Sequence, residues 1–241
     1  PSRDPAARRA VTVHGNGAKV AGDIERRAAA VIEDAQRVDV GVLEPRRQCV
    51  MCRVGPLLFD LRLQDFMVLQ GGGRWFNVGA GTSGRLATLD AAECPPTFGV
   101  SPKLVQAVVA GGRRALTHAV EGAEDSAAQG ARDLAARHVS RRDAVVGLSA
   151  SGATPYVLGA LKMARSKRAV TIGVTAKRSA PISRIAEITI APDTGPELIH
   201  GSTRMKAGSA QKAVLNTLST ASLVRLGHVY NNWMVDVALA N

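Results

Sequence analysis

The sequence predicts an α/β protein in which helices cover both faces of a mostly parallel central sheet. Short runs rich in Val, Ile and Leu alternate with helix-like segments over residues 73–227. Continuous apolar runs of this kind are typical of strands that are buried on both faces, as in parallel sheets. Aromatic residues make up only 3% of the chain. This favours closely packed layers of helix on sheet, an α/β/α sandwich, over an aromatic-rich β-sandwich.

The predicted elements follow one another as strand, turn and helix. Apolar and β-branched runs predict strands over 75–78, 143–148, 169–174 and 187–191, with a further apolar run over 104–110. Helical patterns predict helices over 18–38, 57–70, 85–92, 126–138, 156–165 and 202–226. We therefore expect a partly helical, divergent N-terminal segment, 1–65, followed by one α/β domain, 66–241, that includes the long helix 202–226.

Glycine and proline mark where several of these elements end. Three consecutive glycines, 71–73, stop the helix that precedes the first strand, and the pair Pro95-Pro96 stops the helix 85–92. Gly227 is suited to end the long helix. In a doubly wound sheet, ligands bind at the carboxyl ends of the strands. The loops 79–84 and 149–154 both follow strands, and we expect the site there.

Charge and cysteine content argue against several classes of protein. The 31 basic and 20 acidic residues give a formal charge of +11, but the basic residues are dispersed without interleaved aromatics, so we expect no nucleic-acid partner. Cys49 and Cys52 form a CxxC pair without a second ligand pair, so we expect no metal site. No apolar run approaches the roughly 18 residues that span a bilayer, and we expect a soluble, cytoplasmic protein.

The first loop, Gly79-Ala80-Gly81-Thr82-Ser83-Gly84, lies between a strand and a helix. Its glycines let backbone N–H groups approach an anion, the helix N-terminus carries partial positive charge, and Thr82 and Ser83 add hydroxyl donors. The spacing also matches the dinucleotide motif G-x-G-x-x-G, but the acidic residue that this motif requires after the next strand is missing. A phosphate cradle, a dinucleotide loop and a purely structural turn are all compatible with this loop.

The second loop, Ser149-Ala150-Ser151-Gly152-Ala153-Thr154, repeats the same arrangement of strand, small hydroxyl residues, glycine and helix. Either loop alone could be an ordinary helix N-cap. Two such loops at the ends of parallel strands are better explained by one phosphorylated ligand between them.

Five longer segments carry a resemblance to a known family. They are GAGTSGR (79–85), LDAAECPPTFGVSP (89–102), AVEGAEDS (119–126), SASGATPYVLGAL (149–161) and GSTRMKAGSAQKAVLNTLSTASLVRLG (201–227). Together they closely resemble the N-acetylmuramic acid 6-phosphate etherase family, whose members are sugar isomerase (SIS) domain proteins. The resemblance runs from about Gly72 to Asn241, whereas residues 1–65 scarcely share it.

The resemblance implies a lyase that cleaves the D-lactyl ether of N-acetylmuramic acid 6-phosphate to N-acetylglucosamine 6-phosphate and D-lactate, without metal or organic cofactor. This is a step of cell-wall recycling. A carboxylate would remove the C2 proton of the open-chain sugar, an acid would protonate the departing C3 oxygen, and water would then add. By motif position, Glu93 is the expected acid and Glu124 the second catalytic glutamate, with the base as its expected role.

The resemblance also implies a set of residues that hold the sugar phosphate and a second copy of the chain. The expected ligand-binding residues are Gly81, Thr82, Ser83, Gly84, Ser149, Ser151, Gly152, Thr154, Ser202 and Lys206. Sites in this fold commonly lie near a dimer interface, so we expect a homodimer. The alternative is a non-catalytic sugar-phosphate sensor similar to the glucokinase regulatory proteins, which would keep the phosphate loops but would not need Glu93 and Glu124. An SIS aldose–ketose isomerase is a weaker third possibility, because the ECPPTFG and EGAED motifs argue against it.

Overall fold

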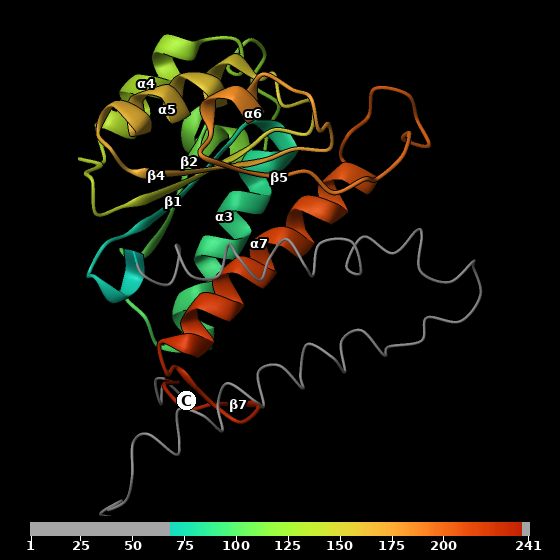
Figure 1. The fold of residues 1–241 in the computed structure, drawn as a ribbon. Helices are drawn as coiled ribbons and strands as arrows, with labels where there is room; N and C mark the ends of the chain where they lie inside the picture. The colour runs from blue at the N-terminus through green and yellow to red at the C-terminus, as the bar shows by residue number, and fades with distance from the viewer. Residues whose placement is uncertain (1–67, 238–241) are drawn as a thin grey trace, which may run out of the picture. The chain divides into compact units, whose positions relative to one another are not determined.

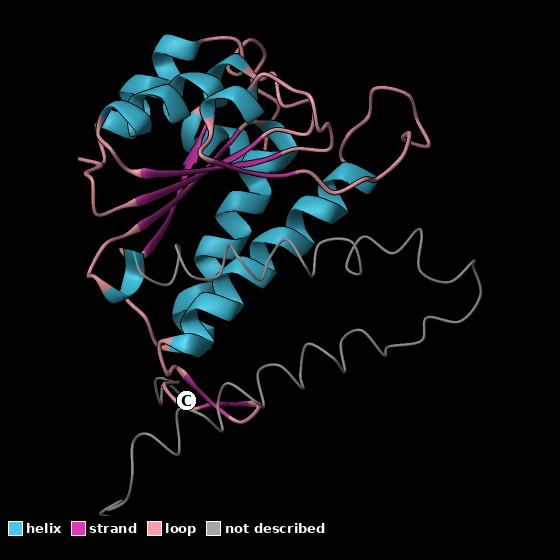
Figure 2. Cartoon of the chain, in the orientation of Figure 1, coloured by secondary structure: helices cyan, strands magenta, loops and turns pink. Residues whose placement is uncertain are grey.

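A five-stranded parallel sheet forms the centre of the computed structural model, which describes residues 68–237. The strands are β1 (Trp75–Gly79), β2 (Val105–Val109), β3 (Ala144–Leu148), β4 (Val170–Val174) and β5 (Ile188–Ile190), and their order in the sheet is β2-β1-β3-β4-β5. Each strand runs parallel to its neighbours (Figure 2). The winding direction changes between β1 and β3, which is the switch point of a doubly wound sheet.

Helices cover both faces of this sheet. Helices α3 (Gly81–Phe98) and α7 (Lys206–Arg225) lie on one face, and α4 (Ala127–Ala135), α5 (Pro155–Ser166) and α6 (Ile182–Ile185) lie on the other (Figure 1). The strands alternate accordingly, because Trp75 packs with the α3 and α7 side while Phe76 packs with the α4 and α5 side. The predicted three-layer α/β/α sandwich is confirmed.

The prediction that Pro95-Pro96 ends the helix predicted over 85–92 is wrong. Helix α3 begins at Gly81 and continues through both prolines to Phe98, where Gly99 takes a left-handed φ of 64° and donates its N–H to the Pro95 carbonyl (2.9 Å). The prolines lie in the last turn, and the φ angle that their rings impose is a helical one. Their missing N–H groups leave two carbonyls one turn earlier without intrahelical partners. One of these belongs to Ala92, which is exposed to water.

The long helix begins four residues later than predicted, at Lys206 instead of residue 202. The carboxylate of Glu197 accounts for this start, because it accepts hydrogen bonds from the backbone N–H groups of Lys206 (3.0 Å) and Ala207 (2.9 Å). The predicted end is confirmed. Gly227 has a φ of 91°, and its N–H and that of His228 reach back into the last turn.

The remaining described elements are short. A 3-10 helix, η1 (Gly112–Leu116), follows β2, and a small antiparallel hairpin of β6 (Val229–Tyr230) and β7 (Trp233–Met234) follows α7. The predicted helix 18–38, most of the helix 57–70, the Cys49–Cys52 pair and the predicted segment 1–65 lie outside the described residues. No helix within 68–237 is both long and apolar enough to cross a membrane.

Two buried carboxylates link neighbouring elements of the fold through hydrogen bonds. Asp143 accepts hydrogen bonds from the backbone N–H, Nε and Nη2 of Arg74 (2.9, 3.1 and 2.9 Å) and so joins the amino ends of β1 and β3. Burial alone would raise the pKa of Asp143, but the hydrogen bonds from Arg74 and Ser140 outweigh burial and lower it.

The second carboxylate, Asp90, belongs to α3 and contacts β1 and α7. It accepts from Asn77 Nδ2 (3.2 Å) and from Ser219 Oγ (2.9 Å), and Asn77 Oδ1 in turn accepts from the indole of Trp75 (2.6 Å). Burial raises the pKa of Asp90, although the hydrogen bonds from Ser219 and Asn77 oppose that rise. This network fixes α3 and α7 against the strand that leads into the first loop.

Candidate active site

The two hydroxyl-rich loops lie next to each other at the carboxyl ends of neighbouring strands. Gly79, the last residue of β1, pairs with Leu148, the last residue of β3. The loop 79–84 therefore leaves the sheet beside the loop 149–154, at the switch point where doubly wound proteins bind ligands. The sequence prediction that these loops meet at one edge of the sheet is confirmed.

In the first loop, the three glycines have two different roles. Gly79 and Gly84 allow the end of β1 to touch the first turn of α3, since a Cβ on Gly79 would lie 2.7 Å from the Gly84 nitrogen. Gly81 instead has a left-handed φ of 54°, and a Cβ there would meet nothing within 4 Å. The first turn of α3 contains no acidic residue. The N–H groups of its first three residues, 81–83, have no intrahelical acceptors, so this turn can receive an anion.

The side chains of Ser83 and Thr82 in the first loop both lie against helix α7. Ser83 is buried and donates its hydroxyl hydrogen to Gln211 Oε1 (2.8 Å). Thr82 lies against the first turn of α7, where its methyl group would be 3.4 Å from a Cβ on Gly208. Helix α7 therefore sets the position of both residues.

In the second loop, three hydroxyls converge. Ser149 Oγ shares a hydrogen bond with Thr154 Oγ1 (2.8 Å) and lies 3.4 Å from Ser151 Oγ. Thr154 is the N-cap residue of α5, yet its side chain does not cap that helix. Gly152 has a structural role, because its φ is 67° and a Cβ there would lie 2.4 Å from the Cβ of Ala180.

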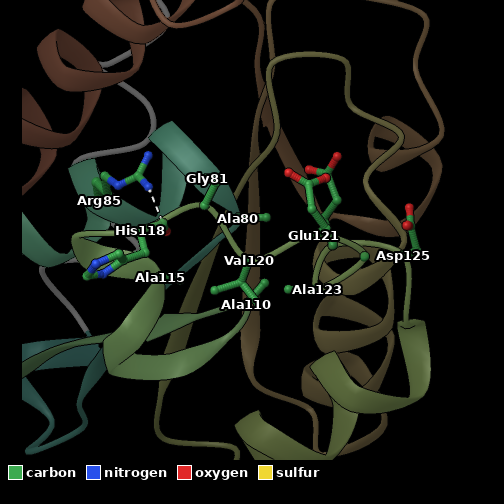
Figure 3. Close-up of a pocket in the computed structure, with 13 residues that line it drawn as sticks. Ala80, Gly81, Arg85, Ala110, Ala115, His118, Val120, Glu121, Ala123 and Asp125 are labelled. Carbon is green, nitrogen blue, oxygen red and sulfur yellow. Dashed lines mark hydrogen bonds between the residues drawn. The ribbon is translucent and has the colours of Figure 1, made fainter.

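A pocket of about 260 Å³ opens beside the first loop. Figure 3 shows Arg85 and His118 on one side of it, Glu121 and Asp125 on another, and Gly81 between them. Glu124 also lines this pocket, and its carbonyl accepts from the Tyr156 N–H (3.0 Å), which ties the segment 119–126 to the start of α5. The structure thus places Glu124 beside the first loop and next to the start of α5, the helix that follows the second loop.

Arg85 and His118 were not among the predicted site residues. The Arg85 guanidinium donates to the carbonyls of Leu116 (3.0 Å) and His118 (3.1 Å), and these bonds hold the segment after η1 against α3. The signal for Arg85 was its place in the GAGTSGR segment. Nothing in the sequence singled out His118, whose ring hydrogen-bonds Thr117 Oγ1 (2.8 Å).

Of the predicted site residues, only Gly81 and Glu124 line this pocket, and Glu93, Ser202 and Lys206 are among those that do not. Glu93 is exposed on α3, and the 12 residues from Gly81 to Glu93 span about 18 Å of helix. The Lys206 ammonium donates to the Pro196 carbonyl (3.0 Å). Within residues 68–237, no group of three or more His, Cys, Asp or Glu side chains is arranged to bind a metal ion.

Two family models match the chain, the N-terminal SIS domain of glucokinase regulatory protein over residues 63–165 and the SIS domain over residues 117–221. Solved structures share the fold. A protein of E. coli CFT073 in complex with A5P has a TM-score of 0.55 at 14% identity and covers 89% of this chain and 95% of its own. A phosphoheptose isomerase from Francisella tularensis has a TM-score of 0.53 at 18% identity and covers 85% and 96%. These matches confirm the SIS fold.

Curated N-acetylmuramic acid 6-phosphate etherases match much more closely in sequence. The etherase of Actinobacillus pleuropneumoniae serotype 5b is 53% identical over 172 residues, which are 71% of this chain and 57% of that protein. The chain thus spans little more than half of that relative. Etherase 1 of Bacillus licheniformis is 48% identical over 214 residues, 87% of this chain and 70% of that protein. Residues 66–241 cannot supply 87% of the chain, so the similarity extends into the segment 1–65 that we had expected to be divergent. The chain belongs to the N-acetylmuramic acid 6-phosphate etherase family.

Proposed function

We propose that this chain cleaves the D-lactyl ether of N-acetylmuramic acid 6-phosphate by elimination and hydration, releasing N-acetylglucosamine 6-phosphate and D-lactate. The observation that carries the proposal is the identity of about half of the residues to etherases over most of the domain, with Glu124 lining a pocket beside the first loop. The proposed route uses carboxyl groups, hydroxyls and water, with no cofactor. The cytoplasmic location stays a prediction.

The phosphate group is proposed to bind between the two loops. The first turn of α3 offers backbone N–H groups and partial positive charge at Gly81, Thr82 and Ser83. Ser149, Ser151 and Thr154 offer converging hydroxyls from the neighbouring strand end. Gly84 and Gly152 support the loops through close packing. Lys206 is the first residue of the helix that contacts Thr82, and Ser202 lies four residues before it.

Glu124 is proposed as the base that removes the C2 proton. This proton is acidic because it lies α to the C1 aldehyde of the open-chain sugar, so a positioned carboxylate is a strong enough base. Six single bonds of about 1.5 Å separate the phosphorus from C2, a span on the order of 9 Å at most. The pocket between Gly81 and Glu124 is of the size of a sugar, with a volume of about 260 Å³.

Glu93 is proposed as the acid that protonates the departing lactyl oxygen, and a second copy of the chain is proposed to supply it. The helix places Glu93 about 18 Å from Gly81, and Glu93 does not line the pocket that contains Glu124. Glu93 is exposed on α3, one turn from Leu89, an apolar side chain that is 44% exposed. A symmetric dimer through this face brings Glu93 of one copy toward the pocket of the other.

The test is release of D-lactate from N-acetylmuramic acid 6-phosphate by the purified chain and by two matched variants. Glu124→Ala should lose turnover by a factor of about 100 to 10,000, as expected for loss of a general base. Glu121→Ala, a neighbouring exposed glutamate of the same pocket, should keep most of the activity. Binding of the sugar phosphate without lactate release by a folded wild type would instead support the sensor, the alternative suggested by the match to glucokinase regulatory protein.

A further inference from the structure

The side chain of Gln211, on the second turn of α7, is 3% exposed and is only partly hydrogen-bonded. Its Oε1 accepts the hydroxyl hydrogen of Ser83 at 2.8 Å. Its Nε2 is the single buried side-chain nitrogen or oxygen atom in the described part of the chain without a hydrogen-bond partner. A buried amide in which only one of the two polar atoms is hydrogen-bonded is unusual, because buried polar groups nearly always have hydrogen-bond partners.

The present direction of this bond conflicts with phosphate binding by Ser83. A serine hydroxyl has one hydrogen to donate and lone pairs that accept. While the hydrogen points to Gln211 Oε1, Ser83 can offer a phosphate oxygen only lone pairs, and two acceptors repel each other. The first loop would then bind phosphate without the hydroxyl that its sequence provides.

We propose that Gln211 is a positioning residue that sets the direction of the Ser83 hydroxyl, and that its carboxamide turns over when the phosphorylated sugar binds. This inference rests on the proposed phosphate role of Ser83. The two ends of a carboxamide have nearly the same size, so the turn needs no repacking of the helices. Afterwards Nε2 donates to Ser83 Oγ, and the Ser83 hydrogen is free to donate to the phosphate.

Only an amide provides both states at this position. A carboxylate at 211 can accept from Ser83 but cannot donate to it, and it adds a negative charge near the phosphate. An apolar side chain of similar length leaves the hydroxyl without a partner on α7, so its direction is no longer controlled. The methyl group of Thr82 also lies beside Gly208, so the same helix adjoins both hydroxyl residues of the first loop.

The experiment measures binding of N-acetylglucosamine 6-phosphate to the full chain by titration calorimetry, with unphosphorylated N-acetylglucosamine as the reference ligand. Ser83→Ala and Gln211→Glu should each weaken the phosphorylated sugar about tenfold or more, the effect of losing a hydrogen bond to a charged group. The weak reference ligand should change little. Gln211→Met should have an intermediate effect. The control Gln106→Glu makes the same amide-to-carboxyl change on β2, where the amide bonds the Lys103 carbonyl, and should bind like wild type.

The pH dependence separates a role in orientation from a role in packing. Below the pH at which residue 211 of the Gln211→Glu variant takes up a proton, its carboxyl can donate to Ser83. The ratio of variant to wild-type affinity should therefore rise as the pH is lowered, whereas damaged packing would not recover. Thermal unfolding identifies any variant that fails to fold. If Gln211→Glu fails to fold, Gln211→Met is compared with wild type instead.

The possible results separate the inference from the proposed function. If Ser83→Ala weakens binding while Gln211→Glu and Gln211→Met bind like wild type, the inference is wrong and the phosphate site stands. If Ser83→Ala binds like wild type, Ser83 does not bind the phosphate, and the inference is wrong as well. A pH-independent loss in Gln211→Glu would reduce Gln211 to a packing residue and also overturn the inference.

Discussion

The proposal that Glu93 and Glu124 of one site come from two copies of the chain leads to a sharp prediction for mixed dimers. A dimer that combines one Glu93→Ala chain with one Glu124→Ala chain contains one site in which both glutamates are intact. Its other site lacks both. The mixed dimer should therefore regain about half of the wild-type rate per dimer, although each homodimeric variant is nearly inactive.

The magnitude follows from the length of α3. Glu93 follows Gly81 by 12 residues, or about 18 Å, while the phosphorus and the C3 oxygen of the substrate, also six bonds apart, are separated by on the order of 9 Å at most. A glutamate side chain extends by about 5 Å, so Glu93 could reach this oxygen within one chain only if the substrate and the side chain were almost fully extended along α3. Loss of either glutamate in a homodimer should lower turnover by a factor of about 100 to 10,000. Regaining half of the wild-type rate is therefore easily measured above this background.

The assay uses two chains with different affinity tags, which are expressed together and purified over both columns so that only mixed dimers remain. D-lactate release is then measured with N-acetylmuramic acid 6-phosphate. The matched control pairs a wild-type chain with a chain that carries both substitutions. If the glutamates act across the interface, this control is nearly inactive, because each of its sites lacks one glutamate.

The reverse result would refute the reasoning. Glutamates that act within one chain leave the mixed dimer of single variants inactive and give the control dimer half of the wild-type rate. Sedimentation or light scattering must show that each purified species is a dimer. A chain that stays monomeric and still releases lactate at the wild-type rate would also rule out the proposed arrangement.

Three further predictions concern stability and are checked by denaturant unfolding. Gly152→Ala should lower the free energy of unfolding by about 1–2 kcal/mol or more, because the residue has a φ of 67° and the new Cβ would lie 2.4 Å from that of Ala180. Asp143→Ala should cost about 2 kcal/mol near neutral pH. Since folding lowers the pKa of Asp143, its stabilisation is present above the usual carboxyl range and is lost as the pH falls, and the variant should lack this acid-dependent loss. The pH dependence of stability that Asp90 contributes has the opposite sign. Folding raises its pKa, so wild-type stability should fall as the pH rises above 3.8, and Asp90→Asn should remove that part of the pH dependence.

The sheet and its loops were predictable because their signals are local. Runs such as Ala144–Leu148 are β-branched and bounded by turns, and each carries enough information to be identified as a buried strand. The positions of the loops 79–84 and 149–154 then follow from the rule that parallel strands present their carboxyl ends at one edge. No contact between distant residues was needed for this part of the fold.

The errors arose where distant residues decide the local structure. Pro95-Pro96 reads as a helix stop, but packing of Cys94 and Phe98 against the sheet keeps α3 helical through them. The start of α7 depends on the carboxylate of Glu197, nine residues before Lys206, which no cap signal next to the helix reveals. Gln211 is 128 residues from Ser83, and in the sequence it is an ordinary polar residue of a long helix.

The exposure of Glu93 is the strongest reason to involve a second copy of the chain. A general acid for a poor leaving group works best where water is excluded and the carboxyl keeps its proton near neutral pH. Glu93 faces solvent in a single chain, while Asp90 and Cys94 of the same part of α3 are buried. Helix α3 cannot rotate to bury Glu93 without breaking the contacts of Asp90 with Asn77 and Ser219. Covering by another surface is therefore the available way to exclude water, and a symmetric partner would cover Glu93 and supply the distant pocket in one step.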